Sequence, residues 1–242
     1  MTATHNIRPA VLVPGHWLGA WAWDEVVEHL TTDGTRTVAM TLPGRDEDDP
    51  ERAAKTVDDQ AAAIRDTIAE QGDQPVLLVA HSGANFPVSL VLDRHPELIA
   101  RVVWVDSGPV ADSTAFAADF PTESEDLPLP SFDDLGQQAS LEGLSAEALE
   151  RFRTKAVPEP APVLRQSVEL TNGARHSVPT TMVCCSISGE QVMALAKAGH
   201  PMFAEVANLE SLDVVDLPTG HWPMWSRPRD LAEIIRATSQ TS

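Results

Sequence analysis

LLVAHSGAN, residues 77–85, is an apolar run that stops abruptly at a histidine, a serine and three small residues. The run lies largely within PVLLVA at 75–80, a continuous apolar stretch typical of a strand in the middle of a parallel sheet. The next stretch, 84–97, has the pattern of a helix. Ser82 therefore stands where a buried strand gives way to a helix.

A tight strand-to-helix turn crowds the backbone at its apex, so it favours small residues on either side of the apex. Ala80, Gly83 and Ala84 meet that need around Ser82. The pattern small-x-Ser-x-small predicts a nucleophile elbow, with alanine in place of both usual glycines. Such a turn lifts the Ser82 hydroxyl clear of the sheet and leaves the Gly83 N–H at a helix N-terminus, where it can stabilise an anion. The alternative is a serine that only caps the helix.

Strand-like and helix-like stretches alternate along the rest of the chain. Besides 75–80, strands are expected at 10–13, 36–42, 101–106, 180–187 and 212–217, and helices at 22–30, 56–72, 84–97 and 227–238. This alternation predicts an α/β fold, with a mainly parallel sheet of about six strands and helices on both faces.

One stretch, 109–175, interrupts the alternation with prolines, acidic loops, no clear strand and one good helix at 145–155. We expect it to be a small helical lid inserted into a core made of 1–108 and 176–242. An ordinary irregular excursion is the alternative.

The chain has 242 residues and a formal net charge of −19, which argues against nucleic acid and anionic membranes as partners. No apolar run is long enough to span a bilayer, and the N-terminus MTATHNIRPA has no signal core, so a cytoplasmic protein is expected. Cys184 and Cys185 are adjacent and fit neither a disulfide nor a zinc site. We expect no metal and a small-molecule partner, with a homodimer left open.

A serine hydroxyl is a weak nucleophile and needs a base. The segment PTGHWPMWSRP at 218–228 places His221 on the loop after the last expected strand, at the same edge of the sheet as Ser82. The order serine, acid, histidine along the chain is typical of hydrolases of this fold class. A histidine that only shapes the loop is the alternative.

Three segments together resemble the α/β-hydrolase family: VPGHWLGAWAWDEV at 13–26, AHSGA at 80–84 and GHWPMWSRPRDLAEII at 220–235. The pattern is similar to the branch of plant esterases and hydroxynitrile lyases and its bacterial relatives. Pro14 stands where that family often has histidine. The resemblance implies no cofactor, and it implies an oxyanion hole made by the backbone N–H groups of His16 and Gly83. The His16 imidazole either reaches this site or only packs beside it.

The resemblance leaves two positions for the acid that orients His221. The family's more usual position falls at Ser188, which carries no carboxylate, and Glu190 lies two residues later. The other position is the end of the preceding strand, where Asp106 stands in WVDSGP. We favour Asp106 and keep two alternatives, Glu190 and a site without any single acid.

These residues predict a serine hydrolase that cleaves a small or medium apolar carboxylic ester or lactone through an acyl-enzyme. Trp17 and Trp222 flank the expected site in the sequence and are candidates for substrate binding. A cofactor-free dioxygenase or a lyase of the same fold, using His221 and Asp106, is the alternative. A non-catalytic receptor of this fold is the third and least favoured hypothesis.

Overall fold

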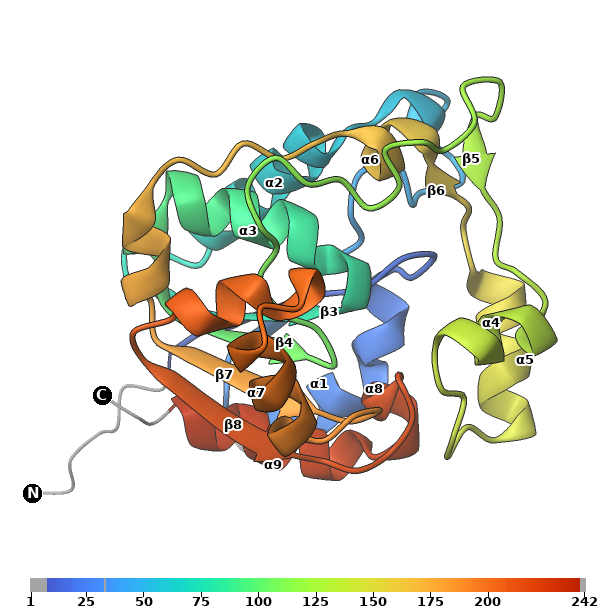
Figure 1. The fold of residues 1–242 in the computed structure, drawn as a ribbon. Coiled ribbons are helices and arrows are strands. Elements are labelled where there is room, and N and C mark those ends of the chain that lie inside the picture. The colour runs from blue at the N-terminus through green and yellow to red at the C-terminus, as the bar shows by residue number, and fades with distance from the viewer. Residues whose placement is uncertain (1–7, 33, 240–242) are drawn as a thin grey trace, which may run out of the picture.

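The structure, a computed structural model, describes residues 8–32 and 34–239 (Figure 1). Residues 1–7 belong to the N-terminal stretch that is expected to contain no signal core, and they lie outside the described residues. Six parallel strands form one sheet in the order β2-β1-β3-β4-β7-β8, which confirms the predicted fold class. Their bounds are Ala10–Val13 (β1), Thr37–Ala39 (β2), Val76–His81 (β3), Ile99–Val105 (β4), Thr180–Cys184 (β7) and Leu212–Asp216 (β8).

Helices cover both faces of this sheet. Alternate residues of β3 point to opposite sides: Leu78 packs with α2 and α3, whereas Leu77 and Val79 pack with α1 and α9. Both faces are buried, which explains why β3 is apolar up to its last residue, His81. The helix bounds are Asp24–Thr32 (α1), Val57–Ala69 (α2), Asn85–Arg94 (α3), Gly189–Lys197 (α7), Pro223–Ser226 (α8) and Pro228–Ser239 (α9).

Several 3-10 helices join these elements. Their bounds are Ala20–Trp23 (η1), Arg52–Ala54 (η2), Ser82–Ala84 (η3), Pro96–Leu98 (η4), Gly173–Ser177 (η5) and Pro201–Asn208 (η6). The predicted helix at 84–97 ends earlier, at Arg94, because the residue before Pro96 is disfavoured in the helical conformation. His95 instead has a φ of −140°.

The predicted strand at 180–187 also ends early, at Cys184. The backbone N–H groups of Cys185 and Ser186 donate to Asp106 Oδ1, at 3.0 and 2.9 Å, and therefore do not continue the sheet ladder. The backbone at the end of β7 thus holds the side chain of Asp106, the residue directly after β4.

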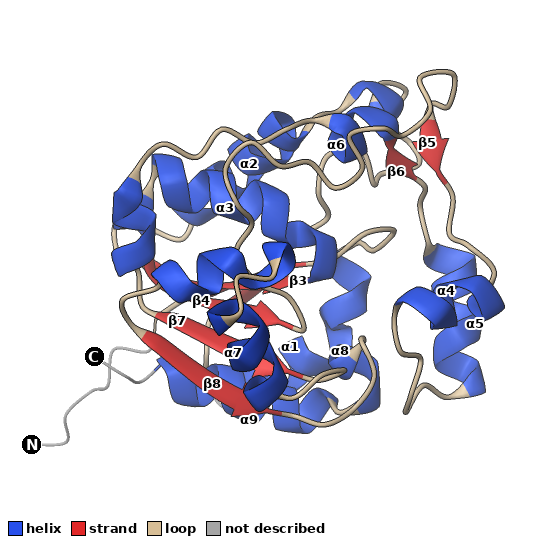
Figure 2. Cartoon of the chain, viewed as in Figure 1, coloured by secondary structure: helices blue, strands red, loops and turns tan. Residues whose placement is uncertain are grey.

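The segment 109–175 contains more structure than its sequence predicts. The expected helix is present as α5, Ala146–Lys155, and Ser145 caps its N-terminus. Two further helices, α4 (Phe132–Gln138) and α6 (Ala161–Arg165), were not expected. The expectation of no strand is wrong, since β5 (Asp126–Leu127) and β6 (Glu159–Pro160) pair antiparallel beside α6 (Figure 2). Two-residue strands are too short to show an alternating pattern.

Every strand of the main sheet runs in the same direction, so the loops that follow the strands gather at one edge. The loops after β1, β3, β4 and β8 contain four of the residues singled out from the sequence: His16, Ser82, Asp106 and His221. Within residues 8–32 and 34–239, none of the helices combines the length and the apolar character that crossing a bilayer requires.

Candidate active site

Ser82 lies at the turn between β3 and α3, as the sequence predicts. Its φ is +51°, a left-handed conformation that is unusual for a residue with a side chain. Such strain persists only where the surroundings enforce it, and it often marks a functional position. The loop after β1 approaches this turn so closely that a Cβ atom on Gly15 would lie only 2.7 Å from Ser82 Cβ.

A continuous chain of hydrogen bonds links three side chains from three different loops. His221 Nε2 lies 2.8 Å from Ser82 Oγ, and His221 Nδ1 lies 2.6 Å from Asp106 Oδ2. The structure therefore brings together the serine, the histidine and the favoured acid. Glu190, the alternative acid, lies exposed in the first turn of α7.

The surroundings of Asp106 keep its carboxylate ionised. Burial raises the pKa of this group, but hydrogen bonds from His221 and Ser186 and the charge of His221 outweigh it and lower the pKa to about 2. Ser186 donates both its N–H and its hydroxyl, at 2.9 and 2.7 Å. An ionised carboxylate can only accept hydrogen bonds, so it favours the tautomer of His221 with the proton on Nδ1.

His81, the last residue of β3, contacts the loop that carries His221. Its Nε2 lies 2.7 Å from the backbone carbonyl oxygen of His221, and the two rings are 4.9 Å apart. Burial, together with the neighbouring His221, lowers the pKa of His81 to about 3. His81 is therefore neutral at physiological pH and donates its Nε2–H to that carbonyl. This contact was not predicted from the sequence.

The pKa of His81 predicts a pH dependence of stability. Its folded pKa of about 3 lies below the unfolded value of about 6.5, so between these values the unfolded chain binds a proton that the fold does not. The free energy of unfolding should therefore be highest above pH 6.5 and fall by up to about 1.4 kcal/mol per pH unit below it. Urea unfolding at pH 7, 6 and 5 measures this slope.

The variant His81→Gln should lose most of that slope, because glutamine does not titrate. His200→Gln is the matched control, since His200 is exposed and should leave the slope unchanged. The pKa values of Asp106 and Glu159, both about 2, affect stability only below about pH 4.5, outside this window. If the free energy of unfolding changed equally with pH in wild type and in His81→Gln, His81 would not be the group that causes the pH dependence.

The loop after β1 packs directly against the turn at Ser82. The His16 ring lies where a side chain on Gly83 would have to go, so only glycine fits at position 83. The His16 ring is buried, and it also forms an edge contact with the ring of Phe116, at 4.4 Å between centroids. The imidazole therefore reaches the site, and the two predicted oxyanion residues, His16 and Gly83, are in contact.

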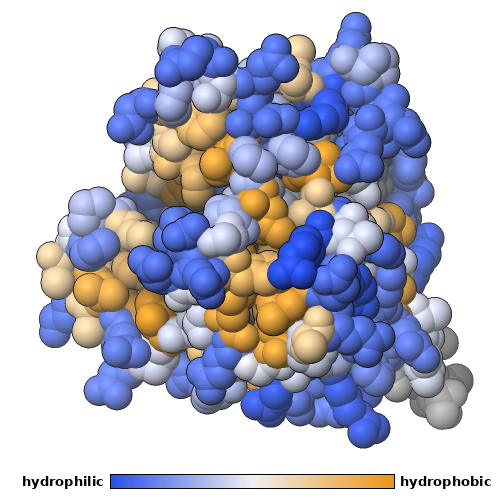
Figure 3. All heavy atoms as spheres, turned by 90° about the vertical axis from the view of Figure 1, so that its right-hand side faces the viewer, coloured by the Kyte–Doolittle hydropathy of each residue, from blue (hydrophilic) through white to orange (hydrophobic). Residues whose placement is uncertain are grey.

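A cavity of about 770 Å³ opens beside Ser82 and His221. Trp17 and Trp222, the two candidates for substrate binding, both line it and are almost fully buried. Within the described residues, neither lysine nor arginine lines the cavity, and the only carboxylate there is that of Asp106. Figure 3, seen from the side of α4 and α5, shows apolar residues grouped on a mainly hydrophilic face.

A family model described as the alpha/beta hydrolase family matches residues 10–234 of the chain. The chain belongs to this family. The strand order, the position of Ser82 after β3 and the histidine after β8 all agree with that assignment.

Curated relatives of this hydrolase-family chain include plant proteins. Methylesterase 9 of Arabidopsis thaliana is 34% identical over 104 residues, which are 40% of this chain and 39% of the relative. Putative methylesterase 14, chloroplastic, of the same plant is 28% identical over 108 residues, 44% of this chain and 31% of the relative. The matches therefore span about a third of the length of these relatives.

Solved structures match the hydrolase-family fold over almost the whole chain. An extracellular alpha/beta-hydrolase from a Paenibacillus species has a TM-score of 0.74 at 20% identity, covering 96% of this chain and 98% of that one. The methylesterase MES16 from Arabidopsis has a TM-score of 0.73 at 16% identity, covering 96% and 100%. At these identities the likeness establishes the fold.

The segment 109–175 holds the loop that carries His221. The backbone N–H groups of Gly220 and His221 donate to the carbonyl oxygens of Glu142 and Ser140, at 3.1 and 2.7 Å. On the opposite side, Val157 N–H donates to the carbonyl oxygen of Trp17, at 3.0 Å. The segment expected to be a lid therefore touches the backbone on both sides of Ser82.

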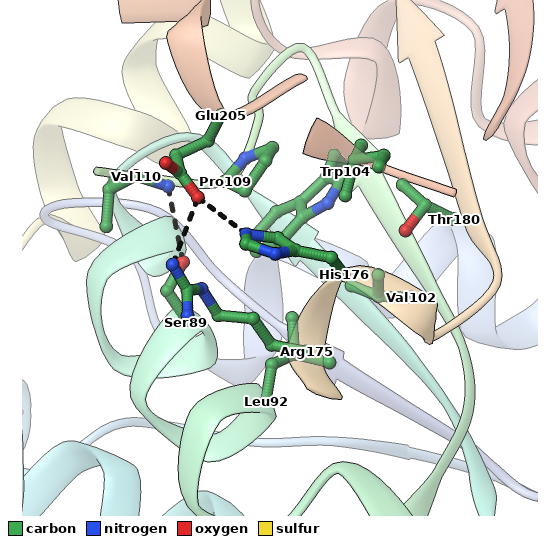
Figure 4. Close-up of a pocket in the computed structure, with 11 residues that line it drawn as sticks. Ser89, Leu92, Val102, Trp104, Pro109, Val110, Arg175, His176, Thr180 and Glu205 are labelled. Atoms are coloured by element: carbon green, nitrogen blue, oxygen red, sulfur yellow. Dashed lines mark hydrogen bonds and ion pairs between the residues drawn. The ribbon is translucent and has the colours of Figure 1, made fainter. Parts of the chain in front are cut away.

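A second, small cavity of about 10 Å³ is lined by residues of α3, β4, η5 and η6. Its polar groups pair with each other, because Arg175 Nη2 and His176 Nε2 lie 3.3 and 3.0 Å from the same Glu205 oxygen (Figure 4). The space suffices for about one water molecule. Its groups join η5 to η6, and we assign it a structural role. No cluster of potential metal ligands occurs in the described part of the chain.

Proposed function

We propose that the protein is a serine hydrolase that cleaves neutral, apolar carboxylic esters or lactones through an acyl-enzyme. The observation that carries this proposal is the unbroken chain of contacts from Ser82 Oγ through His221 to Asp106, at 2.8 and 2.6 Å. This is the arrangement that activates a serine in hydrolases of unrelated folds. The relatives named as methylesterases support the same chemistry.

In the proposed mechanism Ser82 Oγ attacks the ester carbonyl carbon while His221 Nε2 takes the hydroxyl proton. The carbonyl oxygen gains the negative charge, which the N–H groups of His16 and Gly83 stabilise. His221 then returns the proton to the leaving alkoxide, which departs as the alcohol. A water molecule, deprotonated by His221, attacks the acyl-enzyme, and the proton returns to Ser82 as the acid leaves.

The lining and the volume of the cavity favour uncharged substrates of modest size. With no cation among its described lining residues, it offers nothing to pair with a carboxylate on the substrate. Trp17 and Trp222 supply large apolar surfaces next to Ser82. A volume of about 770 Å³ is within the range of small-molecule sites. We therefore propose a small or medium apolar ester, with methyl esters suggested by the relatives' names.

A panel of esters tests the proposal. The p-nitrophenyl esters of acetate, butyrate and octanoate, together with methyl esters of aromatic acids, should be hydrolysed without any added cofactor. The mono-p-nitrophenyl ester of succinate, which is anionic, should be turned over more slowly than the neutral butyrate ester of similar length. Oxygen consumption with hydroxylated aromatic compounds, without hydrolysis of any ester, would instead support a dioxygenase that uses His221 and Asp106.

A further inference from the structure

The mechanism above leaves one buried ion pair without a role. Arg45 follows β2, and Glu159 is the first residue of β6, in the insertion. Their side chains have no exposed surface, and Arg45 Nη2 lies 2.9 Å from Glu159 Oε2. Burying two charges is costly, and such a pair rarely adds stability over apolar residues of the same size. Its contacts indicate another purpose.

The pair contacts three consecutive residues of the loop after β1. Arg45 Nη1 donates to the backbone carbonyl oxygens of Pro14 and Gly15, at 2.9 and 2.5 Å. Glu159 Oε2, the oxygen that contacts Arg45, also lies 2.9 Å from His16 Nδ1. Burial raises the pKa of Glu159, but the charge of Arg45 and the contact with His16 lower it to about 2, so the group is a carboxylate.

The planarity of the peptide bond links these contacts to the oxyanion hole. The Gly15 carbonyl and the His16 N–H belong to one trans peptide, so they point in opposite directions. Holding the carbonyl oxygen on Arg45 therefore turns the His16 N–H away from Arg45. Gly15 packs against Ser82, and the His16 ring packs against Gly83. A change in this peptide would thus disturb both proposed donors.

We propose that Arg45 and Glu159 are positioning residues for the oxyanion hole. Arg45 fixes the Gly15–His16 peptide with its N–H directed to the bound carbonyl oxygen, and Glu159 fixes Arg45 and the His16 ring. This inference rests on the proposed esterase function, since it concerns the charged intermediate of that reaction. It also implies that β6, which carries Glu159, stays docked against His16 and Arg45 during turnover.

The test removes both charges together, in Arg45→Met/Glu159→Gln, so that no unpaired charge remains buried. The matched control is Arg52→Met/Asp126→Asn. Arg52 and Asp126 also pair the core with the insertion, at 2.6 Å, without contacting residues 14–16. For each protein we would measure the thermal midpoint, kcat and KM with the best p-nitrophenyl ester, and the inhibition constant of a matching trifluoromethyl ketone.

The ketone reports on the oxyanion hole directly. Ser82 Oγ adds to its carbonyl carbon, the hydroxyl proton passes to His221, and the carbonyl oxygen becomes an oxyanion held in the hole. In Arg45→Met/Glu159→Gln we expect kcat to fall about tenfold to a hundredfold. This fall should not exceed the one that removal of a single oxyanion-hole donor causes. KM should stay within about threefold, and the inhibition constant should rise in step with the loss of kcat/KM. The control pair should keep its kcat and its ketone affinity.

Three results would overturn the inference. The first is unchanged kcat and ketone affinity in a folded Arg45→Met/Glu159→Gln protein. The second is an equal loss in the control pair, which would indicate general loosening of the insertion. If the double variant fails to fold, the variant Arg45→Lys replaces it, because lysine keeps the charge but cannot bridge two carbonyls and a carboxylate. The third result is an unchanged kcat in Arg45→Lys. Wild type that hydrolyses no ester would instead overturn the proposed function, and this inference with it.

Discussion

Replacing Ser82 by alanine is expected to lower kcat for ester hydrolysis on the order of 10⁵-fold or more. The substitution removes the proposed nucleophile, Ser82 Oγ, while His221, Asp106 and the cavity remain in place. Alanine tolerates the left-handed backbone at this position about as well as serine does, so the fold should survive. Steady-state release of p-nitrophenolate, with urea unfolding as the check on folding, measures the effect.

Ser89→Ala is the control for that experiment. Ser89 is a buried serine of α3, the helix that follows the turn, and its hydroxyl accepts from Val110 N–H at 3.4 Å. Loss of this hydroxyl should change kcat less than about threefold. Turnover that is indifferent to Ser82 would remove the proposed nucleophile from the mechanism.

Replacing Asp106 by asparagine is expected to lower kcat about 10³- to 10⁴-fold. An amide can donate its N–H₂ to His221 Nδ1, which favours the tautomer with the proton on Nε2. That tautomer cannot take the proton of Ser82. The amide oxygen can still accept from the N–H groups of Cys185 and Ser186, so the end of β7 keeps its contacts. Steady-state kinetics and urea unfolding test both parts.

Glu190→Gln is the matched control, since Glu190 is the other carboxylate that the sequence leaves open. It is exposed on α7, and its neutralisation should leave kcat unchanged. A large loss in Glu190→Gln, with activity retained in Asp106→Asn, would reverse the assignment of the acid.

The sequence predicts the sheet and the turn at Ser82 because their signals are local. The apolar run before His81 indicates a buried strand, and the small residues around Ser82 indicate a tight turn. Strand ends are harder to predict when a distant side chain competes for the backbone. Asp106 stops β7 at Cys184 in this way, and nothing in residues 180–187 shows it.

The supporting residues of the site could not be predicted, since they act across long separations in the chain. Glu159 lies 143 residues from His16 in numbering and meets it only after folding. Arg45 stands in the acidic stretch RDEDDPE at 45–51, whose charges predict a solvated loop. The Arg45 side chain is nevertheless fully buried. The sequence predicts a lid at 109–175, but the backbone contacts of this segment to Trp17 and His221 emerge only in three dimensions.

Mass spectrometry of the protein during turnover tests the central claim most directly. A reaction of wild type with a slowly hydrolysed p-nitrophenyl ester is quenched in acid within the first turnover, and the intact mass and its peptides are measured. The account predicts a mass increase of one acyl group less one hydrogen, located on the peptide that contains Ser82 and absent from Ser82→Ala. Hydrolysis without any adduct on Ser82, or an adduct on another residue, would contradict it.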